Sequence, residues 1–282
     1  MKSSRFLLLV CVASLSRVNG FFRRPEKAPK KQVATKEEGP QRGRHLPTPL
    51  SGRDVYRAYQ DLKEEYTRVL DSKKWKVLSQ KPDGTSVSLL THPNDPTCPY
   101  VRLTATVPGI SVADCWDYLR IDNWPESMPR MNPYFEGYSV HGHWTHRGVH
   151  MSLVRIRLHR IGGLFGKRDQ AFVSVSDAPH MDGTRWSGTV SVETPKVPRK
   201  KGYTRAFQDS IGIYRPRGKE MDLTIVFRID LNDQLGGGGI VPMFLYVQTV
   251  GRTGIQSMQR MKEALLEAKH VPRWKRLLGS AI

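Results

Sequence analysis

Alternating apolar and polar residues fill most of the chain between residues 74 and 231. In residues 222–231, for example, Leu223, Ile225 and Phe227 begin an apolar row, and mostly polar residues fall between its members. Successive side chains of a strand point to opposite faces, so this pattern predicts strands with one apolar face and one face exposed to water. About nine such segments follow one another, which predicts a large antiparallel sheet that must curl and cover its apolar face.

Two segments with helical periodicity flank the predicted sheet. Residues 53–70 carry apolar side chains at spacings of three and four behind a capping sequence at Ser51, which predicts an amphipathic helix. Residues 241–269 predict a second helix of about 40 Å, with Pro242 in its first turn. The glycines at 236–239 are expected to form a hinge before it. The pattern therefore predicts an α+β fold, a curved antiparallel sheet of about nine strands closed by a long C-terminal helix.

Shorter signals divide the region between the two predicted helices. Residues 74–81 and 85–92 flank a Pro-Asp-Gly turn and predict a hairpin. Residues 111–121 predict a short helix that begins after Ser111. The prolines at positions 125, 129 and 133 should break the segment that follows, because proline removes a backbone donor and disfavours helix interiors.

The first 20 residues have the features of a signal peptide. Lys2 and Arg5 precede about ten apolar residues, a stretch too short to span a bilayer. We expect the protein to enter the secretory pathway or to be secreted. Phe21 and Phe22 follow the predicted cleavage site, and this order resembles the bipartite leaders of complex plastids, which are the alternative destination.

The chain is strongly basic, with a formal net charge of +19. Residues 21–50 are rich in charged residues and proline without an apolar period, and they predict a disordered basic linker. Residues 271–282 predict a basic tail. The excess of positive charge extends over the rest of the chain, which favours an anionic partner such as an acidic membrane surface or a nucleic acid.

Few residues suggest chemistry. Cys98 and Cys115 remain after the leader, and we expect two buried thiols, with one disulfide as the alternative. Several histidines between residues 141 and 150 raise the alternative of a metal site, but the typical zinc-ligand spacings are missing and residues 141–148 fit a hairpin turn better. No nucleophile elbow occurs in the sequence. We therefore expect no catalytic residues, no metal and no cofactor.

Five short motifs in chain order resemble those of the START domain (steroidogenic acute regulatory protein-related lipid transfer), which has a helix-grip fold. They are an opening strand at Trp75, a mid-domain tryptophan at Trp124, Arg168 and Asp169 within residues 166–175, Arg205 within residues 203–207, and residues 227–233 before the closing helix. Two departures concern the ligand more than the fold. Pro125 stands where the family usually has an aspartate, and the glycines at 236–239 lengthen the last turn.

The resemblance covers residues 51–270 and implies a function. Family members hold one lipid or sterol in an internal cavity and often carry it between membranes, without catalysis. Periodicity alone would favour a solid core, so the expected cavity rests on the resemblance. The alternatives are a cyclase-like enzyme that uses the same cavity, and a basic membrane-binding adaptor without a cavity.

A buried lipid head group needs polar partners, because unpaired polar groups are costly away from water. The resemblance places candidates on the inward face of the sheet and on the closing helix: Tyr138, His159, Gln208, Phe227, Phe244, Tyr246 and Gln248. We expect Arg155 and Arg157 to be solvated, since they lie opposite the apolar row of their strand. Arg168 and Asp169 are expected to form a structural ion pair.

Membrane contact is predicted for one apolar loop and two basic segments. In the loop 160–166, Leu164 and Phe165 would insert into a membrane surface, and an ordinary flexible loop is the alternative. The basic candidates, each adding about 1 kcal/mol near acidic lipid, and an interfacial tryptophan are Lys196, Arg199, Lys200, Lys201 and Trp274. For both basic segments the alternative is a solvated run of charges. We expect a monomer that binds a lipid or sterol and meets anionic membranes peripherally, and no nucleic acid.

Overall fold

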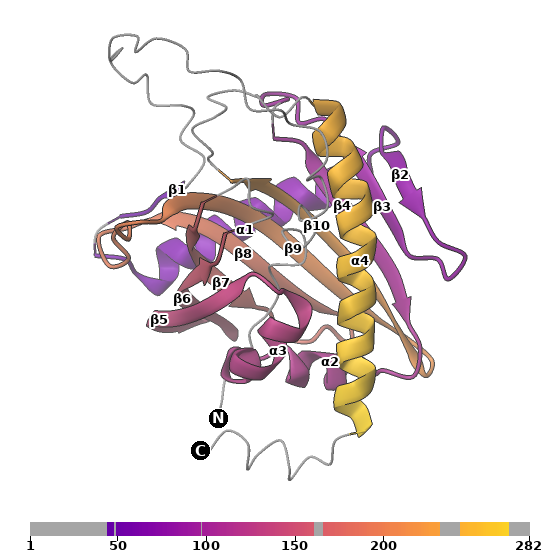
Figure 1. Cartoon of the computed structure of the whole chain (residues 1–282). Coiled ribbons are helices and arrows are strands. Elements are labelled where there is room, and N and C mark those ends of the chain that lie inside the picture. Colours follow the sequence, from indigo (N-terminus) through magenta and orange to yellow (C-terminus); the bar gives the residue numbers. More distant parts are fainter. Residues whose placement is uncertain (1–43, 48, 97, 161–165, 232–242, 271–282) are drawn as a thin grey trace, which may run out of the picture.

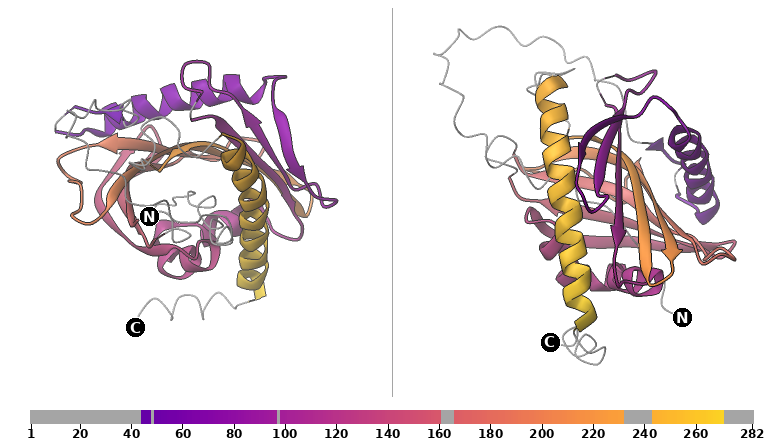
Figure 2. Two further views of the ribbon diagram at one scale, coloured as in Figure 1. Left: turned by 45° about the horizontal axis from the view of Figure 1, so that its top comes forward. Right: turned by 90° about the vertical axis from the view of Figure 1, so that its right-hand side faces the viewer.

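The computed structural model describes residues 44–47, 49–96, 98–160, 166–231 and 243–270 of the chain (Figure 1). These residues form a curved sheet with helices on both sides. The helix α1 lies on the convex side of the sheet, and α2, α3 and α4 lie on the concave side (Figure 2).

Nine strands follow in the order β2-β3-β4-β10-β9-β8-β7-β6-β5, and each is antiparallel to its neighbours in this order. A tenth strand, β1 (Arg44–His45), pairs in parallel with β8. The nine strands are β2 (Lys76–Gln80), β3 (Ser86–Leu90), β4 (Tyr100–Val107), β5 (Phe135–His146), β6 (Val149–Leu158), β7 (Arg168–Ser176), β8 (Arg185–Glu193), β9 (Thr204–Arg217) and β10 (Glu220–Asp230). The predicted antiparallel sheet of about nine strands is confirmed.

The helix α1 (Gly52–Leu70) begins where the capping sequence predicts, because the side chain of Ser51 accepts a hydrogen bond from the amide of Asp54 at 3.2 Å. Its buried side chains, among them Tyr59 and Leu62, contact β5, β6, β8 and β9 on the convex side. Gly188 of β8 permits this contact, because a Cβ there would lie 2.5 Å from the Tyr59 ring.

The convex face of the central strands is therefore apolar where α1 covers it, and the prediction of a face exposed to water is wrong there. Val173, Val190 and Ile211 of β7, β8 and β9 are buried in one cluster with Tyr59 and Leu62. The prediction came from segments such as β10, in which polar residues alternate with the apolar row and were expected to face water. In β7 and β8 the valine row points outward and packs against α1 instead.

The concave side is closed by α2 (Val112–Tyr118), a 3-10 turn at Ile121–Asn123, α3 (Trp124–Met131) and α4 (Met243–His270). The closing helix α4 contacts β2, β3, β4, α2 and α3. Their shared core is apolar and includes Leu103, Trp116, Trp124, Met128, Ile156, Phe172, Phe227, Met258 and Leu265. The predicted C-terminal helix is confirmed, whereas its first two predicted residues and the glycine hinge lie outside the described residues.

One local prediction is wrong, and a second, the hairpin turn at 141–148, is confirmed only in its last two residues. Residues 124–131 form α3 although they contain Pro125 and Pro129. Pro125 lies in the first turn, where its missing N–H has no helical partner to lose. The segment 141–148 is not mainly a turn, because β5 continues to His146 and a two-residue turn at Arg147 and Gly148, both with positive φ, joins it to β6.

Cys98 and Cys115 are both buried and are not joined in a disulfide, so the disulfide alternative is wrong. Arg44 and His45, within the range predicted as linker, form β1. Within the described part of the chain, no helix combines the length and the apolar character needed to cross a membrane. The predicted leader and tail lie outside the described residues.

Candidate functional site

The concave faces of β7, β8 and β9 carry uncharged polar side chains. These alternate along each strand with the valines and isoleucines that pack against α1, and they share their face with Phe172 and Tyr214 of the concave core. We call this surface the polar wall, and it consists of Gln170, Ser174, Ser176, Ser187, Thr189, Gln208 and Ser210.

The members of the polar wall are neighbours across the strands. Ser176 lies opposite Ser187, and Ser174 lies opposite Thr189 in the β7–β8 ladder. Thr189 in turn lies opposite Ser210 in the β8–β9 ladder. These ladders therefore give one continuous polar surface at the centre of the sheet, made of Ser174, Ser176, Ser187, Thr189 and Ser210.

Much of the polar wall is buried without hydrogen-bond partners among the described residues. Gln170 is fully buried, and neither its amide oxygen nor its amide nitrogen has a partner. The hydroxyls of Ser174, Ser176 and Ser210 and the side-chain oxygen of Gln208 are in the same condition. Buried polar groups are nearly always paired in native proteins, so such a cluster indicates a bound group that supplies the partners.

Apolar side chains border the polar wall on the same face. Phe172 lies between Gln170 and Ser174 on β7, and Ile156 lies opposite Gln170 on β6. The apolar part continues to Phe227 on β10, where it meets α4 through Met258. The concave side thus combines a polar region with a broad apolar region, which is the pattern of a site for an amphipathic molecule.

The predicted lipid-binding residues have different positions. Gln208 belongs to the polar wall, and Phe227 is buried in the concave core. Tyr138 is partly buried on the concave side, but its hydroxyl donates to the carbonyl of Ile121 at 3.1 Å. His159 is exposed after the end of β6, with Nδ1 3.5 Å from a carboxylate oxygen of Glu136. Three further candidates have side chains outside the described residues: Phe244, Tyr246 and Gln248.

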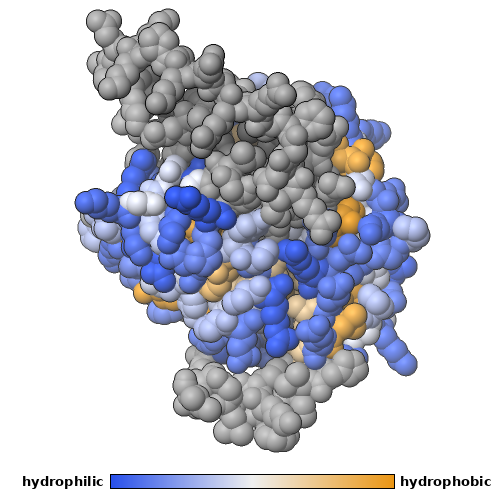
Figure 3. Space-filling view, viewed as in Figure 1, coloured by the Kyte–Doolittle hydropathy of each residue, from blue (hydrophilic) through white to orange (hydrophobic). Residues whose placement is uncertain are grey.

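The basic membrane candidates lie in the loop between β8 and β9. Arg199 donates to the carboxylate of Glu193 at 3.1 Å, and Lys196 lies over the ring of Trp144. Lys200 lies over the ring of Tyr203, and Lys201 is exposed. The other candidates, Leu164, Phe165 and Trp274, lie outside the described residues. On the face shown in Figure 3 the described residues are mainly hydrophilic, and the hydrophobic ones form small separate groups.

The expected ion pair between Arg168 and Asp169 is not formed, because neighbouring residues of a strand point to opposite faces. Asp169 pairs on the convex side with Arg205, at 2.8 Å, and with Arg155, at 3.6 Å. Arg155 is therefore mostly buried and not solvated as predicted. Arg168 points to the concave side and donates from Nε to the carbonyl of Leu231 at 2.7 Å.

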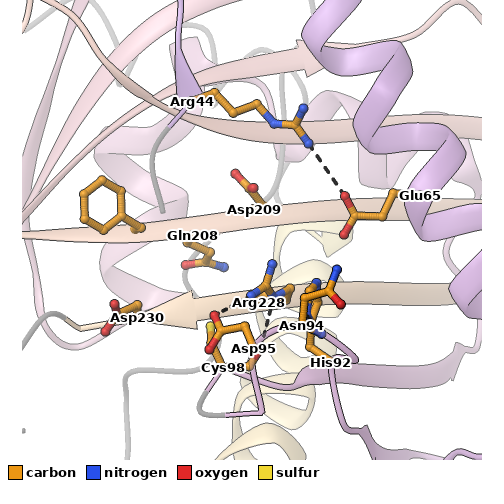
Figure 4. Close-up of a pocket in the computed structure, with 11 residues that line it drawn as sticks. Arg44, Glu65, His92, Asn94, Asp95, Cys98, Gln208, Asp209, Arg228 and Asp230 are labelled. Atoms are coloured by element: carbon orange, nitrogen blue, oxygen red, sulfur yellow. Dashed lines mark hydrogen bonds and ion pairs between the residues drawn. The ribbon is translucent and has the colours of Figure 1, made fainter. Parts of the chain in front are cut away.

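A polar pocket of about 330 Å³ lies where β9 begins and β10 ends (Figure 4). Two ion pairs cross its lining, Arg44 with Glu65 at 3.7 Å and Arg228 with Asp95 at 2.8 Å. The remaining lining residues are His92, Asn94, Cys98, Phe207, Gln208, Asp209 and Asp230. Gln208 is thus shared between this pocket and the polar wall.

The carboxyl group of Asp209, in the lining of the pocket, is electrostatically perturbed. Burial raises the pKa of its carboxyl group to about 6, although the amide of Ser191 donates to it at 2.7 Å and favours the charged form. Gln208 is the one member of the polar wall that was predicted from the sequence, and Asp209 was not predicted. The alternation of serine with valine in β7 and β8 was the only signal for the wall, and it was assigned to a face exposed to water.

Metal-ligating side chains do not gather in the described part of the chain, where no three of His, Cys, Asp and Glu are placed to hold an ion. The histidines of β5 and β6 bond to hydroxyl groups instead. His141 pairs with Ser139, and His143 pairs with Ser152.

Similarity to known proteins is found in the fold of the chain and not in its sequence. By sequence, neither protein-family models nor curated proteins give a match. The structure is similar to human StAR-related lipid transfer protein 5, with a TM-score of 0.61 and 19% identity over 75% of this chain and 98% of that one. It is also similar to human STARD10, with a TM-score of 0.62 and 16% identity over 77% of this chain and 82% of that one.

A bacterial structure extends this likeness. A STAR-related lipid transfer protein fragment from Xanthomonas axonopodis has a TM-score of 0.51 and 16% identity over 68% of this chain and 99% of the fragment. The chain therefore has the START-like helix-grip fold that its motifs suggested. At these identities the likeness concerns the fold.

Proposed function

We propose that this protein binds a single lipid or sterol between the concave face of the sheet and α4, and transfers it between membranes without catalysis. The observation that carries the proposal is the polar wall beside the apolar concave core. An amphipathic ligand would pair the buried polar groups, such as the amide of Gln170, and place its apolar part against Phe172 and Phe227. The START-like fold supports the same function.

Uptake requires the concave side to open. The closing helix α4 is fastened to the β2–β3 turn, because Lys262 donates to Asp83 at 2.9 Å and to Thr85 at 2.7 Å. We propose that α4 and the loop that carries Leu164 and Phe165 move at a membrane surface and admit the lipid. Closure then removes the apolar part of the lipid from water, which favours binding by about 0.8 kcal/mol for each methylene buried.

The membrane surface is proposed to be anionic. The loop between β8 and β9 presents Lys196, Lys200 and Lys201, and the whole chain carries a formal charge of +19. We further propose that the protein acts as a monomer in the secretory pathway or after secretion. Locating a fluorescent protein fused to residues 1–50 would distinguish this route from the complex-plastid alternative.

Native mass spectrometry tests the central proposal. The purified full-length chain would be incubated with liposomes of mixed composition, and bound molecules would be extracted and identified. We expect one lipid or sterol per chain, and transfer of that molecule between donor and acceptor vesicles. A bare protein mass after exposure to a broad lipid mixture would contradict lipid binding. If the protein binds no lipid but binds vesicles in a way that high salt abolishes, the alternative of a basic membrane-binding adaptor without a cavity would be favoured.

A further inference from the structure

We infer that the ligand is an uncharged lipid whose head region carries several hydroxyl, carbonyl or amide groups, and that these groups pair with the polar wall. The inference rests on the proposed function and narrows its ligand class. It excludes two classes that the function alone would allow, phospholipids, whose head groups carry an ionised phosphate, and sterols with a single hydroxyl.

The extent of the polar wall argues for several polar groups on the ligand. Adjacent strands lie about 4.8 Å apart, and residues along a strand rise by about 3.4 Å. The wall therefore covers about 10 Å across β7, β8 and β9. Along β7 its members extend over about 20 Å from Gln170 to Ser176, with the apolar Phe172 between Gln170 and Ser174. A single hydroxyl would pair with one or two of its side chains and leave the others without partners.

The chemistry of the polar wall argues for an uncharged ligand. Its hydroxyl and amide groups both donate and accept hydrogen bonds, and none of them ionises. The buried Arg205 is on the convex side with Asp169, and Arg168 is bonded to the carbonyls of Leu231 and Gly166. Arg185, two residues before Ser187 on β8, lies over the ring of Trp116. An ionised head group against the wall would be buried without a matching charge in it, which is strongly unfavourable.

The unpaired groups also provide selectivity. A site with buried hydrogen-bonding groups rejects a ligand that cannot pair with them, because those groups then stay desolvated and unpaired. Both amide atoms of Gln170 and the hydroxyls of Ser174, Ser176 and Ser210 are in this position. Each pairing lost should reduce affinity by about tenfold.

Competitive extraction from vesicles tests the ligand class. The full-length chain would be offered phosphatidylcholine vesicles with equal amounts of ceramide, diacylglycerol, a monoglycosyl diacylglycerol, cholesterol and phosphatidylserine. We expect at least about tenfold enrichment of one of the first three over the last two. Enrichment of ceramide would indicate that an amide head region pairs with the polar wall. Enrichment of either glycerol lipid would indicate that hydroxyl and carbonyl groups pair with it.

The outcomes separate the inference from the proposed function. Enrichment of cholesterol, phosphatidylserine or the phosphatidylcholine of the vesicles would overturn the inference and leave the proposed function intact. Failure to extract any lipid would overturn both.

Substitutions then test the polar wall itself. Gln170→Leu and Ser174→Ala each remove unpaired groups, so we expect about tenfold weaker selectivity without a loss of thermal stability. Ser88→Ala is the matched control, because the hydroxyl of Ser88 is also buried and unpartnered. Its neighbours on β3, Val87 and Leu89, point to the concave side, so Ser88 points to the other face of the sheet. A lower melting temperature with unchanged selectivity in both wall variants would overturn the inference.

Discussion

At the scale of single residues, Asp169 and Arg205 form a buried ion pair. Both side chains are fully buried, and two hydrogen bonds of 2.8 and 3.1 Å join them. Arg205 also donates to the carbonyl of Val197, so the pair holds the loop between β8 and β9 against the sheet. Without Asp169 the buried guanidinium of Arg205 would keep only the more distant carboxylate of Glu193, at 3.7 Å. Leaving a buried charge with so little compensation is strongly unfavourable.

We therefore expect Asp169→Asn to lower the free energy of unfolding by about 3–5 kcal/mol, measured by urea denaturation. The control is Asp222→Asn, which breaks the pair with Arg217 at 3.4 Å, where the side chains are 43% and 62% exposed. This control should cost less than about 1 kcal/mol. Equal effects of the two substitutions would contradict the role assigned to the buried pair.

Asp209 makes stability depend on pH. Because burial raises its pKa to about 6, the folded protein holds the proton more tightly than the unfolded chain does. The stabilisation that protonation gives is complete below pH of about 4 and is lost as the pH rises through about 6. Asp209→Asn imitates the protonated form, so it should raise the melting temperature at pH 8 and change it little at pH 4.

The comparison of melting temperatures across pH 4 to 8 provides the check. A lower melting temperature of the variant at pH 8 would show that the charged carboxylate is stabilised by Arg44 and Arg228, which favour the charged form.

At the scale of elements, α1 is positioned by a close contact. The ring of Tyr59 lies against the backbone of Gly188, and an added methyl group would approach it to 2.5 Å. We expect Gly188→Ala to destabilise the fold by about 1–3 kcal/mol, because α1 must move away from β8. In a Tyr59→Ala background the same substitution should cost much less, and urea denaturation of the four proteins in this cycle measures the difference. An equal loss of stability in both backgrounds would show that the Tyr59 ring is not the cause of the destabilisation by Gly188→Ala.

The attachment of α4 to the β2–β3 turn should control lipid exchange. Lys262→Met removes the bonds to Asp83 and Thr85, so we expect α4 to separate more easily and lipid transfer between vesicles to become several-fold faster. The control is Arg130→Met, which breaks the exposed pair of Arg130 with Glu267 at 3.2 Å. Similar transfer rates for wild type and both variants would indicate that α4 does not move during exchange.

At the scale of the whole molecule, the loop between β8 and β9 and the turn between β9 and β10 lie at opposite ends of β9. Both present an exposed lysine, Lys201 and Lys219 respectively. In the proposed function, the end with the loop between β8 and β9 contacts the membrane. Lys201→Glu should therefore weaken binding to anionic vesicles more than Lys219→Glu, at about 1 kcal/mol for each charge near the surface.

Vesicle flotation at low and high salt measures this difference, since the attraction is screened as ionic strength rises. Equal losses for the two variants would indicate that the net charge acts without a defined orientation.

The sequence by itself determined the elements and their order. The predicted helix at 53–70, the hairpin after Trp75 and the closing helix are in place, because their signals are local: periodicity, caps and turns. Alternation in strand after strand also determined an antiparallel sheet, and the glycine and proline signals marked most of its turns. The local rule failed at α3, where packing of Trp124 and Met128 in the concave core outweighs the proline penalty.

The tertiary structure alone decided which face of the central strands is the inner one. A period of two shows which residues share a face, but in β7 the rows of Val173 and Ser174 are equally regular, and their direction depends on what packs against each. The distant α1 buries the valine row, so the serine row must face inward. For the same reason Asp169 pairs with Arg205, 36 residues away, and not with its neighbour Arg168. Contacts between distant segments made both choices, and local patterns carry no information about them.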